Sequence, residues 1–508
     1  MDLSVLIILI VFMIALVKLI IYHYKRWDLY KAGNKIPGPR PVLPIIGNIL
    51  LFMDNSDNNL NKMMSLLSNY KSSLVRIWFG QELFIYLFDP DQIKIVLHSS
   101  KSVQKERFVK FFDPWLGTGL FTAPANKWKI HRKLIMPAFH SEILVSFFDT
   151  INKKSEILVR IMESEINKNE FDIVDYISHC VLDIVCETLI GVPSNEQING
   201  KSVYVEAFPR MMRLIYERIM TIPMHTDFIY NFTKSAREQK ECIKYLHKRT
   251  HDNVEQKRRL DYKKINGKNG VLETATPKRK AFLELLIELS DKGTLSEKEL
   301  YEEVDSMMVA ANDTTSTVTS FVIFMLANFP DIQEKCYQEL LEIQNKKTNR
   351  EWRLENEDLN RMKYLETVIK ETMRLFPVAP FVMRNVSDDL DIGGGYTLPK
   401  GCTAVLAFLK LHRSADYWDD PLSFDPDRFS SEQAVKRHPE AYFPFSSGLR
   451  HCPGSKYAMM SMKVIISNLL KNYVLIKDRN VDIEDIELKP DVIIRASNPL
   501  TLKIKRRL

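Results

Sequence analysis

The segment from Ser296 to Phe329 contains no proline and is compatible with a helix throughout. It opens on Ser296 and Glu299, spaced as a capping box in which the two side chains satisfy free N–H groups at a helix start. Pro330 follows and lacks the N–H that would continue the helix. A helix of about 30 residues is long for a globular protein. The sequence therefore predicts one helix that crosses the whole molecule, and with it a large, mainly α-helical fold.

The middle of this helix reads Ala310-Ala311-Asn312-Asp313-Thr314-Thr315. Threonine hydroxyls compete for backbone carbonyls, so we expect the helix to bulge here. Ala310 and Ala311 are small and leave room for a flat group against the helix. Asp313 and Thr314 place an acid beside an alcohol, which together can relay protons. The alternative is an ordinary buried helix whose polar side chains bond to carbonyls one turn earlier.

The loop from Phe445 to Gly454 places a single cysteine among residues suited to a flat metal cofactor. The Cys452 thiolate would bind a haem iron, and Gly448 and Gly454 would let the backbone pass close to a porphyrin. Arg450 would reach a haem propionate. The six cysteines of the chain are scattered, which indicates a reducing compartment and no disulfide framework. The alternative is a free cysteine buried in a turn before a helix.

This loop resembles the haem-thiolate loop of the cytochromes P-450, and other segments match that family's motifs in the family's order. Glu371 and Arg374 resemble its Glu-x-x-Arg helix, and Arg428 resembles the arginine of its Phe-x-Pro-x-Arg-Phe segment. The resemblance implies that these three residues hold the core beneath the haem and perform no chemistry. It also implies that Asp313 and Thr314 are the catalytic pair that delivers protons.

The same resemblance implies the remaining site residues. Cys452 would be the metal ligand. The residues implied to contact the haem are Trp128, Arg132, Ala310, Ala311, Arg384, Phe445, Gly448, Arg450 and Gly454. Among them, the tryptophan and the three arginines would clamp the propionates.

Residues 303–315 resemble the signature of the family-4 branch, including its insect members. Many members of that branch hydroxylate fatty acids at the chain end, and insect members also act on hormones, hydrocarbons and foreign compounds. Ala310 stands where the branch often has a glutamate that forms an ester with the haem, and Ala311 stands at the usual glycine. We therefore expect non-covalent haem b and a weaker preference for the chain end.

The resemblance implies a monooxygenase that inserts one oxygen atom from O2 into a small apolar substrate, such as a fatty acid, hormone, hydrocarbon or xenobiotic. The chain has no flavin or nucleotide motif, so electrons would come from NADPH through a partner, NADPH–cytochrome reductase, with cytochrome b5 as a second expected partner. Lys127, Lys129, Lys133 and Lys456 are candidates for docking an acidic partner. Two other functions stay open: a haem-thiolate isomerase or dehydratase, which needs no reductase, and a non-catalytic membrane carrier of haem or lipid.

The N-terminus is apolar from Leu3 to Ile21, and about 20 such residues span a bilayer as a helix. Basic residues follow it, which by the positive-inside rule places the rest of the chain in the cytosol. No cleavage site of the Ala-x-Ala type follows, so we expect a retained anchor. The prediction is a single-pass protein of the endoplasmic reticulum, with residues 1–22 as the transmembrane anchor, 23–41 as a basic, proline-rich spacer and 42–508 as one haem-thiolate catalytic domain.

The globular part is expected to contain a minor β part. Residues 74–79 and 83–88 are typical of a hairpin, and further strand signal lies at 382–384 and 403–406. The hydrophilic stretch 248–280 is expected to contain the end of one helix and then an exposed basic loop, before the next helix starts at Phe282. A net charge of +7 is modest for 508 residues, which argues against nucleic-acid coating and suits a membrane surface or an acidic partner.

Overall fold

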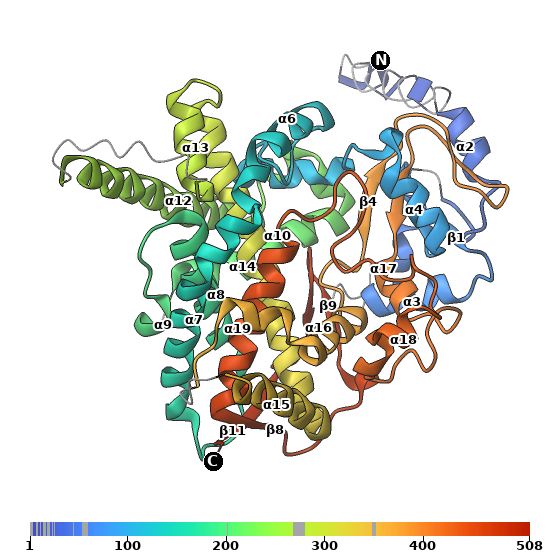
Figure 1. The fold of residues 1–508 in the computed structure, drawn as a ribbon. Coiled ribbons are helices and arrows are strands. Elements are labelled where there is room, and N and C mark those ends of the chain that lie inside the picture. The colour runs from blue at the N-terminus through green and yellow to red at the C-terminus, as the bar shows by residue number, and fades with distance from the viewer. Residues whose placement is uncertain are drawn as a thin grey trace.

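The computed structural model describes residues 26–43, 45–52, 59–200, 202–267, 280–347 and 352–507, with scattered positions before residue 25. Helices make up the larger part, and the main sheet lies to one side of them beside the N-terminal segment (Figure 1). The fold is mainly α with a minor β part, as expected.

The elements have the following bounds. The helices are α2 Trp27–Gly33, α3 Asn59–Ser68, α4 Pro90–His98, α5 Asp113–Leu116, α6 Ala125–Ile135, α7 Ser141–Met162, α8 Ile173–Val185, α9 Glu196–Asn199, α10 Val203–Met220, α11 Asp227–Tyr230, α12 Lys234–Gly267, α13 Phe282–Asp291, α14 Glu297–Asn328, α15 Pro330–Asn345, α16 Lys363–Leu375, α17 Phe408–His412, α18 Ser431–Ala434 and α19 Ser455–Asn472. The strands are β1 Leu74–Phe79, β2 Glu82–Leu87, β3 Phe171–Asp172, β4 Val382–Asn385, β5 Leu390–Asp391, β6 Thr397–Leu398, β7 Thr403–Leu406, β8 Tyr473–Ile476, β9 Leu488–Pro490, β10 Ile494–Ala496 and β11 Thr501–Arg506.

Helix α14 is the long helix predicted from the sequence, and it begins with the expected capping box. It packs against α8, α12, α16 and α19, and most of its side chains are buried. The prediction of a bulge in the middle of the helix is wrong, because residues 310–315 remain α-helical. The Thr314 hydroxyl donates to the carbonyl of Ala310, which absorbs its competing hydrogen bond without distorting the helix. A π-helical turn lies instead at Cys186–Ile190, after α8.

The main sheet has the strand order β1-β2-β7-β4. Strands β1 and β2 form the predicted hairpin, with Leu74 opposite Leu87 and Gly80 at a φ of 59° in the turn. Strand β7 then runs parallel to β2 and antiparallel to β4. Successive side chains of β2 alternate between two apolar clusters: Phe84 joins the large helical core and Ile85 joins a smaller core beneath α4 and α17. The sheet is therefore covered on both faces.

The segment 23–41 does not stand off as a spacer. Residues 27–33 form α2, and the ring of Tyr30 stacks on Trp78 of β1 at 4.5 Å. Arg26 forms an ion pair with Glu82 at 3.1 Å, and the N–H of Arg76 donates to the Pro37 carbonyl at 2.8 Å. Apolar side chains within the segment, which composition alone does not reveal as buried, fix it against the sheet.

The predicted anchor falls largely on positions outside the described residues, which omit 1–3, 7–8, 11, 14–16 and 18–20. Among the residues that are described, no single helix is long and apolar enough to cross a membrane. One bent pair, Ala125–Phe139 with Ser141–Glu165, passes by length and composition alone.

The hydrophilic stretch 248–280 is helical for most of its length. The helix end expected in this stretch belongs to α12, which continues to Gly267 and is supported by charged pairs one turn apart such as Lys248–Asp252. Residues 268–279 lie outside the described part of the chain. Helix α13 begins at Phe282, as predicted.

Candidate active site

One short face of α14 is open in an otherwise buried helix. Ala310 is exposed, and Ala311 and Thr314 are half-buried, while Asn312, Asp313 and every residue from 315 to 328 are buried. Positions 310, 311 and 314 share one side of a helix with 3.6 residues per turn. These three neighbouring positions are therefore the accessible part of an otherwise buried stretch, and the flat group that they are predicted to receive stays a prediction.

Asp313 and Thr314 point in different directions. The Thr314 hydroxyl lies on the open face, 2.7 Å from the Ala310 carbonyl. Asp313 is buried, and its Oδ1 accepts a hydrogen bond from Arg495 of β10. Its Oδ2 has no hydrogen-bond partner among the described residues. Burial raises the pKa of the Asp313 carboxyl, and the Arg495 charge opposes that rise. Arg495 was not predicted as a partner of Asp313, because it lies 182 positions away.

The loop from Phe445 to Gly454 holds Cys452 just before α19 begins at Ser455. The Cys452 N–H donates to the Phe445 carbonyl at 3.0 Å, which closes the loop on itself. Gly448 has a φ of 68°, and a Cβ there would lie 2.1 Å from the Leu97 carbonyl oxygen. Only glycine fits at that position.

Cys452 differs from the other five cysteines, since they are buried and it is half-buried. Burial raises the pKa of its thiol, while the Gly454 N–H and the Arg132 cation lower it. A thiol with nearby donors and a cation is suited to becoming a thiolate ligand.

A cluster of cations lies beside this loop. Arg450 stacks over the Trp128 ring at 4.3 Å and donates to the carbonyls of Val103 and Ala123. Arg384 is buried, and the only bond of its guanidinium among the described residues is to the Met383 carbonyl.

Arg132 contributes a third guanidinium, which lies 3.2 Å from the His451 ring. Burial lowers the pKa of Arg384 to about 10, and burial with the charges of Arg384 and Arg132 lowers the pKa of Arg450 to about 9.

Lys105 joins the cluster and was not anticipated from the sequence. Its ammonium lies 3.7 Å from the centre of the Phe121 ring, and burial followed by the charges of Arg384 and Arg450 lowers its pKa well below the usual range. Lys105 belongs to no spacing pattern, so only the fold reveals it. Among the described residues, none of these four cations forms an ion pair with a carboxylate.

These residues fit a haem. Four unpaired cations would match two propionates, and the Arg450 Nη1, buried without a partner, provides a free donor. Cys452 would supply the iron ligand, Gly448 and Gly454 flank it with little bulk, and the open face of α14 would receive the other side of the ring. Phe445 packs against the main core and supports the loop.

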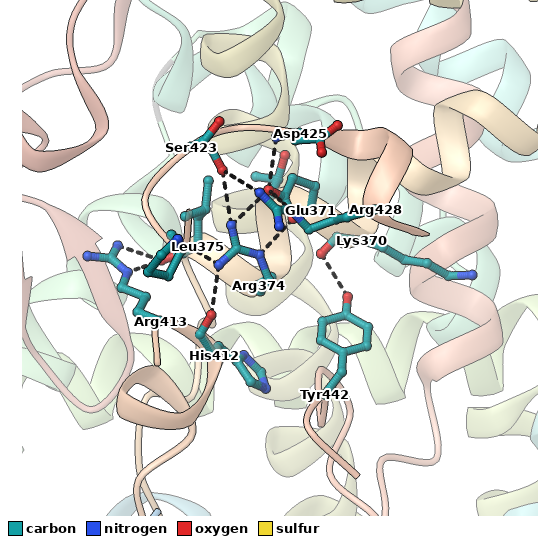
Figure 2. Close-up of polar contacts among 12 residues, drawn as sticks. Lys370, Glu371, Arg374, Leu375, His412, Arg413, Ser423, Asp425, Arg428 and Tyr442 are labelled. Atoms are coloured by element: carbon teal, nitrogen blue, oxygen red, sulfur yellow. Dashed lines mark hydrogen bonds and ion pairs between the residues drawn. The ribbon is translucent and has the colours of Figure 1, made fainter. Parts of the chain in front are cut away.

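Glu371, Arg374 and Arg428 form one buried network (Figure 2). Arg374 donates to both carboxylate oxygens of Glu371, at 2.7 and 2.8 Å, and Arg428 donates to one of them at 3.1 Å. The Glu371 and Arg374 side chains are 0% exposed. Arg374 also donates to the carbonyls of His412, Pro421 and Ser423. The network therefore joins α16 to the chain between residues 412 and 428.

His412 extends this network toward the cysteine loop. Its carbonyl accepts from Arg374 at 2.8 Å (Figure 2). Its ring Nε2 accepts from the Phe443 N–H at 3.0 Å. Burial and the nearby arginines lower the pKa of His412 to about 3, so the ring stays neutral and can accept. Phe445, where the cysteine loop begins, lies two residues after Phe443. The network therefore positions the loop that carries Cys452.

A second unpredicted contact joins α6 to α14. His131 lies 2.7 Å from Glu303 Oε1, and the Leu120 N–H donates to Glu303 Oε2 at 2.9 Å. Both side chains of the pair are buried. This bond fixes α6, and with it Trp128 and Arg132, against the central helix.

Comparison with known sequences agrees with this geometry. The family model described as "Cytochrome P450" matches residues 37–504. The chain belongs to the cytochrome P450 family. It is 34% identical to cytochrome P450 4V2 of Mus musculus over 501 residues, covering 97% of this chain and 94% of the relative.

Two insect relatives are equally similar. Cytochrome P450 4c3 of Drosophila melanogaster is 34% identical over 504 residues, covering 97% of this chain and 93% of the relative. Cytochrome P450 4c21 of Blattella germanica is 34% identical over 492 residues, covering 96% of each chain. The predicted resemblance to the cytochromes P-450, and to family-4 members among them, is therefore confirmed. The protein is a cytochrome P450 monooxygenase.

Proposed function

We propose that this cytochrome P450 is a membrane-bound haem-thiolate monooxygenase that inserts one oxygen atom from O2 into an apolar substrate, with Cys452 as the iron ligand. The observation that carries the proposal is the cluster of four unpaired cations beside Cys452, since buried cations without carboxylates are costly unless an anionic group joins them. The haem, when bound, activates dioxygen, and a thiolate ligand favours cleavage of the O–O bond.

The protein's own groups then have distinct tasks. Arg132, Arg384, Arg450 and Lys105 would hold the carboxylates of the cofactor, and Trp128 stacks against the guanidinium of Arg450. The open face at Ala310, Ala311 and Thr314 borders the space for substrate and dioxygen. The Thr314 hydroxyl is placed to pass a proton into that space, and Asp313 behind it is placed to supply the proton. The buried remainder of α14 excludes bulk water.

Electrons would come from NADPH through NADPH–cytochrome reductase, with cytochrome b5 as a further partner. Lys129, Lys133 and Lys456 are exposed and fit an acidic docking surface. Lys127 does not fit, because it bonds to Thr118 at 2.7 Å and pairs with Glu299 at 3.1 Å. Its charge is already matched within the fold.

Two features of the sequence support a proposal for the substrate class and the location. Ala310 leaves more space on the open face of α14 than a glutamate would, so we propose an apolar substrate bulkier or less strictly held than a straight fatty acid at its chain end. The apolar segment 3–21 supports a single-pass anchor in the endoplasmic reticulum, with the catalytic domain 42–508 in the cytosol. Haem b would be held without a covalent ester, since Ala310 offers no carboxylate.

The test is the absorption of the reduced protein with carbon monoxide. The unmutated protein should give the long-wavelength Soret band of thiolate ligation, and Cys452→Ala should lose it. Cys242→Ala, which removes another buried cysteine, should keep the band. A normal band from Cys452→Ala would falsify the ligand assignment.

Turnover separates the remaining alternatives. Product formation that requires both NADPH and reductase supports the monooxygenase. Conversion of an oxygenated substrate without either would indicate an isomerase or dehydratase, and tight binding of haem or lipid without any conversion would indicate a carrier.

A further inference from the structure

Arg76 of β1 is a buried cation without an acceptor. Its side chain lies in a residue that is 2% exposed, and its Nε and Nη1 are buried without a hydrogen bond to any residue that the structure describes. Nearly all buried polar groups in proteins have a partner, so two unpaired donors on one guanidinium point to an acceptor from outside the chain. Arginine keeps its proton at neutral pH, so the charge stays.

The charged neighbour of Arg76 is a second cation. Burial lowers the pKa of Arg76, the charge of Arg40 lowers it further, and the phenol of Tyr70 opposes them. No carboxylate within the described part of the chain is among these influences. Arg40 itself is exposed. Because a buried charge is costly unless a charge of opposite sign joins it, the missing member of this pair is an anion.

Arg40 is held in place beside Arg76. The Asn48 side chain donates to the Pro41 carbonyl at 3.1 Å, and its Oδ1 accepts a backbone N–H of β1 at 3.0 Å. Gly38 lies directly on the Arg76 stem, where a Cβ would be 2.5 Å from Arg76 Cγ. The proline-rich segment is therefore fixed over the buried guanidinium, and it carries the exposed one.

Trp78 adds a further unpaired donor on the same face of β1. Side chains two residues apart on a strand share a face, as Arg76 and Trp78 do. The Trp78 Nε1 is buried and has no acceptor among the described residues. Its ring stacks on Tyr30 of α2, which follows the apolar segment 3–21. The unpaired donors thus lie next to the part of the chain that leads from the proposed anchor.

The segment that carries Arg40 also exposes apolar side chains. Ile45, Leu50 and Leu51 are each about half exposed, and Lys35, just after α2, is exposed as well. Cations beside exposed apolar groups match a phospholipid, which joins an anionic phosphate to apolar chains. Basic residues next to a membrane segment are a recurring means of recognising such head groups.

We propose that Arg76 and Arg40 form a binding site for the phosphate of an anionic phospholipid. The guanidiniums would donate to the phosphate oxygens in the forked geometry that arginine offers to phosphate. The acyl chains would lie along Ile45, Leu50 and Leu51. A lipid bound there would hold the proline-rich segment at the membrane surface. None of these residues belongs to the proposed haem site.

Binding is measured on the full-length protein in a maltoside detergent, after removal of phospholipid. Dihexanoyl phosphatidylglycerol is the anionic probe, dihexanoyl phosphatidylcholine is the zwitterionic probe with the same chains, and inorganic phosphate is the probe without chains. Calorimetry should show a single site per chain for phosphatidylglycerol. Phosphatidylcholine and inorganic phosphate should each bind at least about tenfold more weakly, since each lacks part of what the site recognises.

Substitutions then assign the site. Arg76→Gln and Arg40→Gln should each weaken the binding of phosphatidylglycerol at least about tenfold, because each removes a charged hydrogen bond. Arg76→Lys keeps the charge but not the fork, so it should weaken binding less than Arg76→Gln does. Arg259→Gln is the matched control, since it removes an exposed arginine of α12, and it should bind normally. All four variants should keep the carbon monoxide band, which reports that they fold.

Thermal midpoints separate a ligand site from a residue that only supports the strand. Arg76→Met replaces the unpaired charge by an apolar side chain. Without lipid this variant should melt at a higher temperature than the unmutated protein, because an uncompensated buried cation is gone. Phosphatidylglycerol should raise the midpoint of the unmutated protein and leave that of Arg76→Met unchanged. A lower midpoint for the lipid-free variant would overturn the site.

Three further outcomes would count against the lipid. Equal affinity for inorganic phosphate would mean a site for a small anion, and equal affinity for phosphatidylcholine would mean that the charge of the head group is not recognised. Normal binding by Arg40→Gln and Arg76→Gln would place the lipid elsewhere. Loss of the Cys452 assignment would leave all of these binding measurements valid, so the two proposals fail independently.

Discussion

Thr314 and Asp313 are adjacent in the sequence, yet they meet different surroundings. Thr314 lies on the open face of α14, while Asp313 is buried against β10. Their roles should therefore separate on mutation. Loss of the hydroxyl should affect only the last step of proton delivery, and loss of the acid should affect the supply behind it.

Thr314→Ala should keep haem and substrate binding but release dioxygen as hydrogen peroxide, with product per NADPH falling about tenfold or more. Product, NADPH and peroxide measured together give the coupling. Thr319→Ala removes a hydroxyl that bonds one turn back at a fully buried site of the same helix, and it should couple normally. Equal coupling in the two variants would remove Thr314 from the mechanism.

The alanine at position 310 leads to a different prediction for the same open face of α14. Because it has no carboxylate, acid and organic solvent should extract all of the haem from the unmutated protein. Ala310→Glu should fill part of the open space and narrow the range of products, as seen by chromatography of the hydroxylated isomers. Haem that resists extraction would contradict the absence of an ester bond. A single terminal product from the unmutated protein would contradict the wider pocket.

At the scale of elements, predictable features were those whose parts lie close in sequence. The capping box of α14, the β1–β2 hairpin and the spacing of Glu371 and Arg374 all occur within a few residues. Their residue types alone therefore indicate the local structure. The charges on α12 also lie close together, but their composition alone does not show how far the helix extends before the expected loop.

The parts that escaped prediction depend on distant partners. His131 meets Glu303 across 172 positions and Arg495 meets Asp313 across 182, and no local spacing encodes either pair. Lys105 and His412 have lowered pKa values because the fold buries them and brings arginines beside them. The sequence therefore indicated the cofactor site, while the contacts that position it required the structure.

The buried network at the end of α16 should be stability-critical. Glu371→Ala leaves Arg374 charged and uncompensated in a site with no exposure, and such breaks cost about 3–5 kcal/mol. The thermal midpoint should fall and the haem absorption should be lost with it. Lys370→Ala, one residue away, breaks a surface pair with Glu366 and should cost under about 1 kcal/mol. Similar midpoints for the two variants would argue against the network's role.

At the scale of the whole molecule, truncations should separate the proposed anchor, residues 1–22, from α2, which packs on the sheet. Deletion of residues 1–22 should release much of the protein from membranes and leave the carbon monoxide spectrum unchanged. Deletion of residues 1–36 also removes α2, whose Tyr30 packs on Trp78, and should lower the thermal midpoint. Fractionation and spectra of both truncations test this. Loss of haem from the shorter deletion would mean that the anchor is part of the fold.

The four cations around the cofactor site enter from both halves of the chain, at Lys105 and Arg132 and then at Arg384 and Arg450. During synthesis, a ribosome must release almost the entire chain before the site can close. The closed site then gathers like charges that repel, unless an anionic cofactor arrives to neutralise them. Haem is therefore expected to drive the final step of maturation by mass action. Cells short of haem should degrade this chain rather than store it empty.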